Sequence, residues 1–436
     1  MSNLFAARTQ MALSLGFHIV FAEIGIAMPL MMAIAEWRWH RTKNEVYLEL
    51  AKRWAKGSAI LFAVGAVSGT VLSFELGLLW PGFMKQAGPV IGIPFSLEGF
   101  AFFTEAIFLG VYLYGWGRIA PPKHIAAGLV VAASGAASAV FVVMVNAWMN
   151  TPAGVSVVQP AVGGLPQIVV RDPIAGMLNP STLQQSIHMV LAAYAATGFA
   201  VAGVHAGLLI RGRNIVFHRA ALRIALLVGA PAAILQPVSG DFSARTVARW
   251  QPVKLAALEG QFETERGAPL RIGGWPDATA RRTRGALEIP YGLSLLAFHD
   301  PRAEVKGLTD FPRSDWPPLP PVHVGFQTMV ALGTLMALVS LWTAITVVRR
   351  RDIAKERWLL RALAIVTPFG FIATEAGWTV TEVGRQPWVV QGIVRTSDAV
   401  TPMAGLVVPM SSFAVLYVGL AVMVVWLLRS MMRATS

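Results

Sequence analysis

Long apolar stretches recur along this chain, and they constrain its fold more than any other feature. The hydrocarbon core of a bilayer is about 30 Å thick, so a helix needs about 20 apolar residues to cross it. Nine stretches reach that length, near residues 11–34, 57–80, 93–116, 125–148, 185–210, 220–238, 324–348, 359–380 and 406–428. Because backbone groups in lipid must bond within their own segment, these stretches predict an all-α membrane protein with nine transmembrane helices.

One polar segment interrupts this pattern. Residues 239–321 follow the sixth stretch and are rich in Arg, Pro and Gly. The chain is therefore expected to divide into residues 1–238 with six membrane helices, an extramembrane loop at 239–321, and residues 322–436 with three further helices. The first stretch is too long for the core of a signal peptide, so we expect it to be the first membrane span.

The distribution of Lys and Arg predicts the orientation of the chain, because short cytoplasmic loops carry an excess of these residues. Twenty of the 36 lie after the first, third, fifth and seventh stretches and in the C-terminal tail, whereas five lie in the short segments on the other side. We therefore expect the N-terminus and residues 239–321 outside and the C-terminus in the cytoplasm. Cations placed between membrane spans also argue against nucleic acid as a partner, despite the net charge of +13.

Cysteine is absent from the sequence. Its absence excludes disulfides, thiolate metal sites, iron–sulfur clusters held by cysteine and covalent attachment of c-type haem. Any metal must therefore be bound by His, Met, Asp or Glu.

Ionisable side chains within membrane spans are costly and usually mark a function. Those within or beside the apolar stretches are His18, Glu23, Glu75, Glu98, Glu105, His188, His205, Glu375 and Glu382. In the predicted orientation most of them converge, together with Met329, on the outer half of the membrane. His205 falls near the cytoplasmic end and stands apart.

Two of these positions could bind one haem from opposite faces. His188 and Met329 each lie about one turn inside the outer end of a span. Histidine is a strong haem ligand, and methionine is a common partner that raises the potential of a low-spin haem. The alternatives are a methionine that fills the core and, for His18 and His188, a histidine that bonds a neighbouring helix.

Glu98 and Glu105 lie seven residues apart, which returns them to nearly one helix face about 10 Å apart along the axis. This spacing suits a proton relay, or one acid beside a metal and a second that supplies it with protons. The alternative is a pair of acids that bond Ser, Thr or backbone groups on another helix.

The polar segment contains the amphipathic run WQPVKLAALEGQFE, with Lys254 and Glu259. A cation and an acid beside apolar surface could bind and deprotonate an amphiphilic substrate such as a quinol. The alternative is a solvated helix face.

Six segments in this order are similar to segments of a known family: GFHIVF, SLEGFAFFTE, SIHMV, QPVKLAALE, GFQTMV and GWTVTEVGRQPW. Together they resemble subunit I of the cytochrome bd-type quinol oxidases over nearly the whole chain. The most specific is GRQPW preceded by Glu and Trp. The short polar segment, SLEGFAFFTE and Gln327, which stands where many members have Arg, resemble the cyanide-insensitive branch, whose members need not carry haem d.

The resemblance implies three haems. His188 and Met329 would be the axial ligands of a low-spin haem b. His18 and Glu382 would be ligands in the oxygen-reducing site, which holds a high-spin haem b and either haem d or a third haem b. Which of these two residues serves which haem stays open.

The resemblance also implies roles for residues around the haems. Glu98 and Glu105 would lie near the oxygen site and on the proton route from the cytoplasm, and Trp378 between the haems. Arg385 would help to hold the haem environment. Lys254 and Glu259 would form the quinol-binding pair, whereas Glu23 matches no assigned family residue.

The expected function is oxidation of quinol at the outer face and reduction of O2 to water, which makes a membrane potential without proton pumping. The expected location is the bacterial inner membrane. The expected partners are quinol, O2, a smaller membrane subunit II and, as a further candidate, a small single-span accessory subunit. The alternatives are a proton-coupled transporter with buried acids, and a haem-binding electron-transfer or assembly subunit without oxygen chemistry.

Overall fold

The structure is a computed structural model that describes residues 2–158 and 166–433. Within those ranges nine helical segments are long and apolar enough to cross a membrane, which confirms the predicted all-α membrane fold. They are α1 (Asn3–Thr42), α2 (Glu45–Leu79), α3 (Pro81–Tyr114), α4 (Pro121–Asn150), α6 (Thr182–Ile210), α7 (Ile215–Trp250), α10 (Leu319–Val348), the pair α11 (Arg357–Ile365) and α12 (Phe369–Val383), and α14 (Val407–Arg433).

Several helices extend beyond the apolar stretches that predict them. Helix α3 begins at Pro81, which occupies its first turn, where a proline costs no backbone hydrogen bond. Helix α7 continues to Trp250, so the first part of the polar segment 239–321 is helical. The division of the chain into three segments stays a prediction, but its first boundary falls inside a continuous helix.

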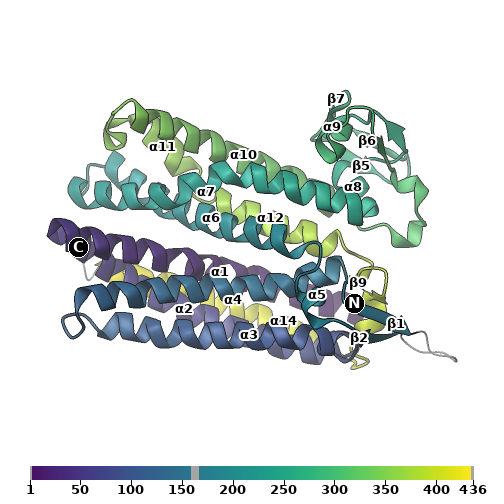
Figure 1. Cartoon of the computed structure of the whole chain (residues 1–436), viewed down its shortest axis with the longest axis horizontal. Helices are drawn as coiled ribbons and strands as arrows, with labels where there is room; N and C mark the ends of the chain where they lie inside the picture. Colours follow the sequence, from purple (N-terminus) through teal and green to yellow (C-terminus); the bar gives the residue numbers. More distant parts are fainter. Residues whose placement is uncertain (1, 159–165, 434–436) are drawn as a thin grey trace.

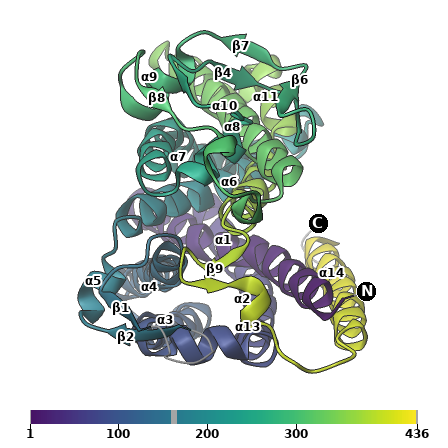
Figure 2. The same ribbon diagram turned by 90° about the vertical axis from the view of Figure 1, so that its right-hand side faces the viewer.

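The long helices form two neighbouring groups, seen end-on in Figure 2. Helices α1–α4 pack together in one group, and α6, α7, α10, α11 and α12 pack in the other. Helix α1 joins the groups because it contacts α6, α7 and α12, while α14 packs against α1 and α2. A large apolar core that includes Met31, Met32, Phe199, Leu222 and Leu359 closes the space between the groups.

The eighth span is broken into α11 and α12 at residues 366–368. Pro368 lacks the amide hydrogen that a continuous helix would need there. Just beyond the break, α12 packs against α6 so closely that a Cβ on Gly370 would lie 2.3 Å from the Cα of Ala196. The break and this contact together fix the position of α12 against α6 within its group.

A small extramembrane unit follows α7 and packs against the adjoining end of α10 (Figure 1). It contains α8 (Pro252–Glu259), α9 (Gly292–Phe298), the short 3-10 helices Leu308–Asp310 and Arg313–Asp315, and three antiparallel strand pairs. The pairs are β3 (Glu265–Arg266) with β8 (Glu304–Val305), β4 (Leu270–Ile272) with β7 (Leu287–Ile289), and β5 (Trp275–Asp277) with β6 (Arg282–Arg284).

Further short elements lie at the same end of the molecule as this unit, near the N-terminus (Figure 1). They are β1 (Val155–Val158), β2 (Gln167–Val170), α5 (Pro173–Met177), β9 (Trp388–Val390), β10 (Val394–Arg395) and α13 (Thr396–Ala399). The C-terminus and the 3-10 helix Ile353–Lys355 lie at the other end. Which end faces the cytoplasm stays a prediction.

Candidate functional site

His188 on α6 is held in one orientation by α7. Its Nδ1 lies 2.8 Å from the hydroxyl oxygen of Ser239, and that hydroxyl donates its single hydrogen to the backbone oxygen of Gln236 at 2.9 Å. The serine can therefore only accept from the imidazole, so Nδ1 carries the proton. The Nε2 atom is therefore unprotonated, which is the form that binds a metal, and it accepts a hydrogen bond from the side-chain amide of Gln236 at 3.2 Å.

His18 on α1 is held in the same way by α2. Its Nδ1 lies 2.9 Å from the hydroxyl oxygen of Ser68, which donates to the backbone oxygen of Gly65 at 3.0 Å. Again the serine fixes the proton on Nδ1 and leaves the Nε2 lone pair free. A Cβ on Gly69 would lie 3.0 Å from Cε1 of His18, so the glycine lets α2 pack tightly against the ring.

Met329 on α10 packs against α12. A Cβ on Gly377 would lie 3.0 Å from its sulfur. Helices α6, α7, α10 and α12 contact one another, so Met329 and His188 belong to one helix group. Both residues lie in the half of their helix nearer the extramembrane unit.

Glu98 and Glu105 of α3 both face α4. Glu98 accepts a hydrogen bond from Ser138 at 3.3 Å. Cβ atoms on Gly135 of α4 and Gly25 of α1 would lie 3.2 Å and 3.8 Å from Glu105 Oε1, so this carboxyl sits where three helices meet. Since α3 begins at Pro81, Glu105 lies about 36 Å along this 34-residue helix, beyond its midpoint and deeper than the predicted outer half.

Glu382, near the end of α12, is the centre of a polar network. It accepts a hydrogen bond from the side chain of Asn146 on α4 and a second from Arg385 Nη2 at 2.5 Å. Trp378 lies one turn earlier on the same helix, on nearly the same face. Arg385 is only 2% exposed, yet its Nε and Nη1 have no hydrogen-bond partner among the described residues.

Lys254 on α8 joins the same network. Its ammonium donates to Asn150 Oδ1 at 2.7 Å and to Gln251 Oε1 at 3.1 Å. Its side chain also packs on α12, because a Cβ on Gly384 would lie 2.9 Å from its Cε. The pKa of Lys254 is lowered to about 7, first by burial and then by the positive charge of Arg385, which together outweigh the opposite effect of Glu382.

Glu259 ends α8 and is also buried. Burial raises its pKa to about 8, although the nearby Arg271 acts in the opposite direction. Its Oε2 atom has no hydrogen-bond partner among the described residues. Lys254 and Glu259 are thus both buried, and neither belongs to the solvated helix face that was the alternative for this segment.

Gln327 on α10 is occupied by the extramembrane unit. Its side-chain oxygen accepts from the backbone N–H of Gly273 at 2.9 Å, and its amide donates to the backbone oxygen of Arg271 at 3.0 Å. With both ends bonded to backbone, Gln327 fastens the turn after β4 to α10.

The remaining intramembrane acids and histidines lie in other environments. Glu75 accepts from Gln10 and Ser14 of α1, both at 2.9 Å. Glu23 on α1 is buried beside Glu375 of α12. His205 pairs with His218 through their Nδ1 atoms, 2.8 Å apart, near the end of α6 opposite His188.

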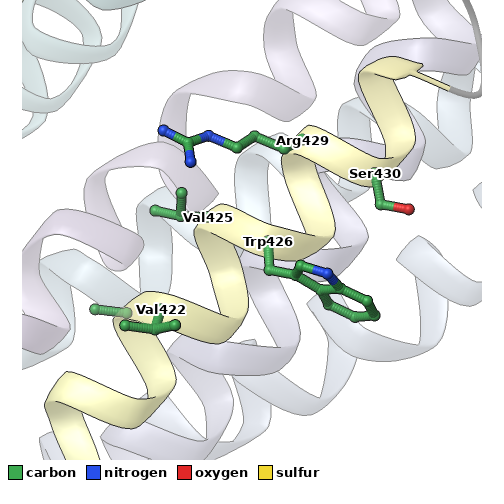
Figure 3. A pocket seen from close by; sticks show the side chains of 6 residues that line it. Val422, Val425, Trp426, Arg429 and Ser430 are labelled. Carbon is green, nitrogen blue, oxygen red and sulfur yellow. The ribbon is translucent and has the colours of Figure 1, made fainter.

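The structure thus brings Lys254, Glu382 and Arg385 into one network and sets Glu98 and Glu105 along one helix interface. It does not connect His18 to Glu382 by any hydrogen bond among the described residues; each is held by a different helix pair. A groove on α14, which includes Val422, Val425, Trp426, Arg429 and Ser430, lies apart from the network, toward the C-terminal end of its helix (Figure 3).

Known proteins match the whole length of this chain. Residues 6–436 match the family described as cytochrome bd terminal oxidase subunit I. The chain belongs to this family.

Individual bd oxidases support the family assignment. The putative cytochrome bd menaquinol oxidase subunit I of Bacillus subtilis (strain 168) is 40% identical over 98% of this chain and 96% of its own length. The cytochrome bd ubiquinol oxidase subunit 1 of the same organism is 31% identical over 98% of this chain and 93% of its own length. The structure of bd oxidase from Geobacillus thermodenitrificans superposes with a TM-score of 0.92 at 38% identity, covering 100% of this chain and 99% of that one.

Membership in the bd oxidase family confirms the predicted membrane-bound quinol oxidase subunit and favours it over the transporter. It also confirms that the chain is a multi-pass protein of the bacterial inner membrane, that it uses haem and that it works with a subunit II. The roles of individual residues, the haem types and the orientation of the termini stay predictions.

The residues present fit haem as a bound group. His18 and His188 both offer an unprotonated Nε2, and each is fixed by a serine on the next helix. The unpartnered guanidinium nitrogens of Arg385 suit an anion such as a haem propionate. Helix α12 contacts α1, α6 and α10, yet Gly370 is its only buried residue. Its other side chains are partly exposed and therefore accessible to a bound group.

Five polar residues of the candidate site were not predicted from the sequence: Ser68, Ser239, Asn146, Asn150 and Gln251. Each acts through a residue on a different helix, so no local spacing could reveal it. For Asn146 and Asn150 the sequence did contain one signal: these two amides lie one turn apart at the end of an otherwise apolar span, although the spacing does not show their partners.

Proposed function

We propose that this chain is the haem-bearing subunit that oxidises quinol near α8 and reduces O2 to water within the membrane. The observation that carries the proposal is that a serine–carbonyl pair holds both His18 and His188 with Nε2 unprotonated, the form that binds a metal. Two histidines held in this orientation by different helix pairs suit two iron sites. An ion-coupled transporter would need neither histidine in this orientation.

His188 and Met329 would hold a low-spin haem b. His18 and Glu382 would bind in the oxygen-reducing site, with a high-spin haem b and either haem d or a third haem b. Haem supplies one-electron transfer and the iron at which O2 binds. Arg385 would neutralise haem propionate charge while it fixes the Glu382 carboxylate, and Trp378 would pack between the haems.

Quinol would bind at the face of α8. Lys254 would orient a quinol oxygen, and Glu259 would accept the proton that quinol loses on oxidation. The names of the relatives mention both menaquinol and ubiquinol, so the proposal is for quinols as a class.

Protons for water formation would come from the cytoplasm along α3. Glu105, where α1, α3 and α4 meet, would pass them to Glu98, which bonds Ser138. Release of protons outside and uptake inside would create a membrane potential without pumping. This requires the N-terminus and α8 to lie outside and the C-terminus in the cytoplasm. The proposed partners are subunit II and a small single-span accessory subunit.

The direct test is quinol-driven oxygen uptake by the complex purified with its subunit II, measured beside its reduced-minus-oxidised spectrum. We expect haem bands and oxygen uptake together. Haem bands without quinol-driven uptake would instead support an electron-transfer or assembly subunit, and no haem bands would refute the proposal.

The rate of quinol oxidation should have a bell-shaped pH dependence. Glu259 accepts a proton only when ionised, so its raised pKa of about 8 makes kcat/KM increase with pH. Lys254 loses its charge as the pH rises through its lowered pKa of about 7, so kcat/KM falls on the alkaline side. In Glu259→Gln the increase should disappear while the alkaline fall remains; an increase that persists would remove Glu259 from this role.

Gly377→Ala should disturb the low-spin haem without changing either of its ligands. The added methyl group would lie 3.0 Å from the Met329 sulfur, tighter than most Cβ contacts, so the sulfur must shift by a few tenths of an ångström. We expect a displaced absorption band of the low-spin haem. Gly333→Ala on α10, where a Cβ would meet nothing within 4 Å, is the matched control and should leave the band unchanged.

A further inference from the structure

The side chains of Asn146 and Asn150 form a ladder between α8 and the end of α12. Lys254 donates to Asn150 Oδ1 at 2.7 Å, Asn150 Nδ2 donates to Asn146 Oδ1 at 3.0 Å, and Asn146 Nδ2 donates to Glu382 Oε1. Asn150 is only 1% exposed, Lys254 4% and Asn146 8%, whereas the Glu382 side chain is 29% exposed, so the ladder runs from the interior to a partly exposed carboxylate.

The charges at its two ends fix the direction of this ladder. An ammonium can only donate hydrogen bonds, so Asn150 must turn its oxygen toward Lys254. An ionised carboxylate can only accept, so Asn146 must turn its NH2 group toward Glu382. Both amides therefore point the same way, and their dipoles stabilise the cation at one end and the anion at the other.

Neighbouring groups hold the ladder in place without interrupting it. Gln251 donates to the backbone oxygen of Asn150 at 2.6 Å and to its Oδ1 at 3.1 Å. Asn150 Nδ2 also donates to the backbone oxygen of Asn146 at 2.9 Å, which fixes the two amides relative to each other. At the far end Arg385 holds the second oxygen of Glu382.

We propose that Asn146 and Asn150 are positioning residues that couple the charge at the quinol-binding Lys254 to the haem bound by Glu382. The proposal rests on the function proposed above, in which Lys254 contacts quinol and Glu382 is a haem ligand. A hydrogen bond and a positive charge directed at a ligating carboxylate make it a weaker electron donor, which favours the reduced iron. Occupation of the quinol site would then adjust the potential of a haem that quinol does not touch.

The test is a spectroelectrochemical titration of the purified complex that carries Asn150→Leu. Asn150 bonds Lys254, Gln251 and Asn146, and none of these is a proposed haem ligand. We expect the midpoint potential of the Glu382-bound haem to fall by about 59 mV, equivalent to a tenfold change in its reduction equilibrium. Lys254→Met should lower it in the same direction, and the double variant should fall no further than the larger single effect, because both changes break one path. Asn150→Asp, which keeps the bond to Lys254 but cannot donate to Asn146, gives the same test if the leucine variant does not fold.

Asn179→Leu is the matched control. Asn179 is a buried amide at the same end of the molecule, and it bonds Thr151 and backbone groups outside the ladder. Its variant should leave the midpoint unchanged. An unchanged midpoint in both Asn150 variants, with a clear shift in Glu382→Gln, would overturn the ladder while leaving the proposed function intact. If Glu382→Gln also left every haem band and midpoint unchanged, Glu382 would not be a ligand and both proposals would fail.

Discussion

Glu382→Ala is expected to lower quinol-driven oxygen uptake by at least about 100-fold, the upper range for loss of a group that supports a metal site. The change removes a proposed haem ligand and leaves Asn146 and the buried Arg385 without the acceptor that they share. Uptake is measured with an oxygen electrode, and the spectrum of the same sample reports whether the oxygen-site haems are retained.

Glu75→Ala is the control for this variant. Glu75 is also a buried acid at the same end of the helices, but among the residues that the structure describes its hydrogen bonds go to Gln10 and Ser14, outside the proposed site. We expect the Glu75 variant to retain oxygen uptake. Retention of full uptake by Glu382→Ala would contradict the role assigned to Glu382.

His188→Ala is expected to remove the low-spin haem from the reduced-minus-oxidised spectrum. It deletes the imidazole whose Nε2 is kept unprotonated through the Ser239 hydrogen bond to Nδ1. Ser239→Ala should act in the same direction with a smaller effect, about 10- to 100-fold in haem affinity, because the ligand remains but loses its orientation.

His205→Ala serves as the comparison on the same helix. His205 pairs with His218 near the opposite end of α6, far from the extramembrane unit. Its variant should retain the low-spin spectrum. A normal low-spin spectrum in His188→Ala, or its loss in His205→Ala, would place this haem elsewhere.

Hydropathy located the membrane helices because each must present about 20 apolar residues to lipid. It could not locate their ends, since a helix that leaves the bilayer needs no apolar sequence. For this reason α3 begins at Pro81 and α7 continues to Trp250, beyond the predicted spans 93–116 and 220–238. The break before α12 was also missed, although Pro368 in the sequence is its cause.

The candidate site likewise contains residues that the sequence predicted and residues that only the structure shows. Residues whose chemistry is unusual in a membrane, such as His188 and Glu382, stand out from the sequence because burying them is costly. Residues that act through hydrogen bonds to other helices do not stand out. Ser239 lies 51 positions from His188 and Asn146 lies 236 positions from Glu382, so only the fold reveals these contacts.

Gln327 shows how the structure changes the interpretation of a single position. In the sequence, Gln327 stands where many members of the family that the chain resembles have Arg, and an arginine there would suit an anion such as a haem propionate. Both ends of the Gln327 amide instead bond the backbone of the extramembrane unit, at Arg271 and Gly273. Gln327 therefore has a structural task in this chain, and Arg385 retains unpartnered nitrogens suited to a propionate.

The central claim is that this chain binds three haems through His188 with Met329, His18 and Glu382. Pyridine-haemochrome extraction of the complex purified with subunit II tests it most directly, because it reports the type and number of haems together. We expect three haems per copy of this chain, either two haem b with one haem d or three haem b. A preparation that reduces O2 with quinol yet contains only one haem per chain would contradict it.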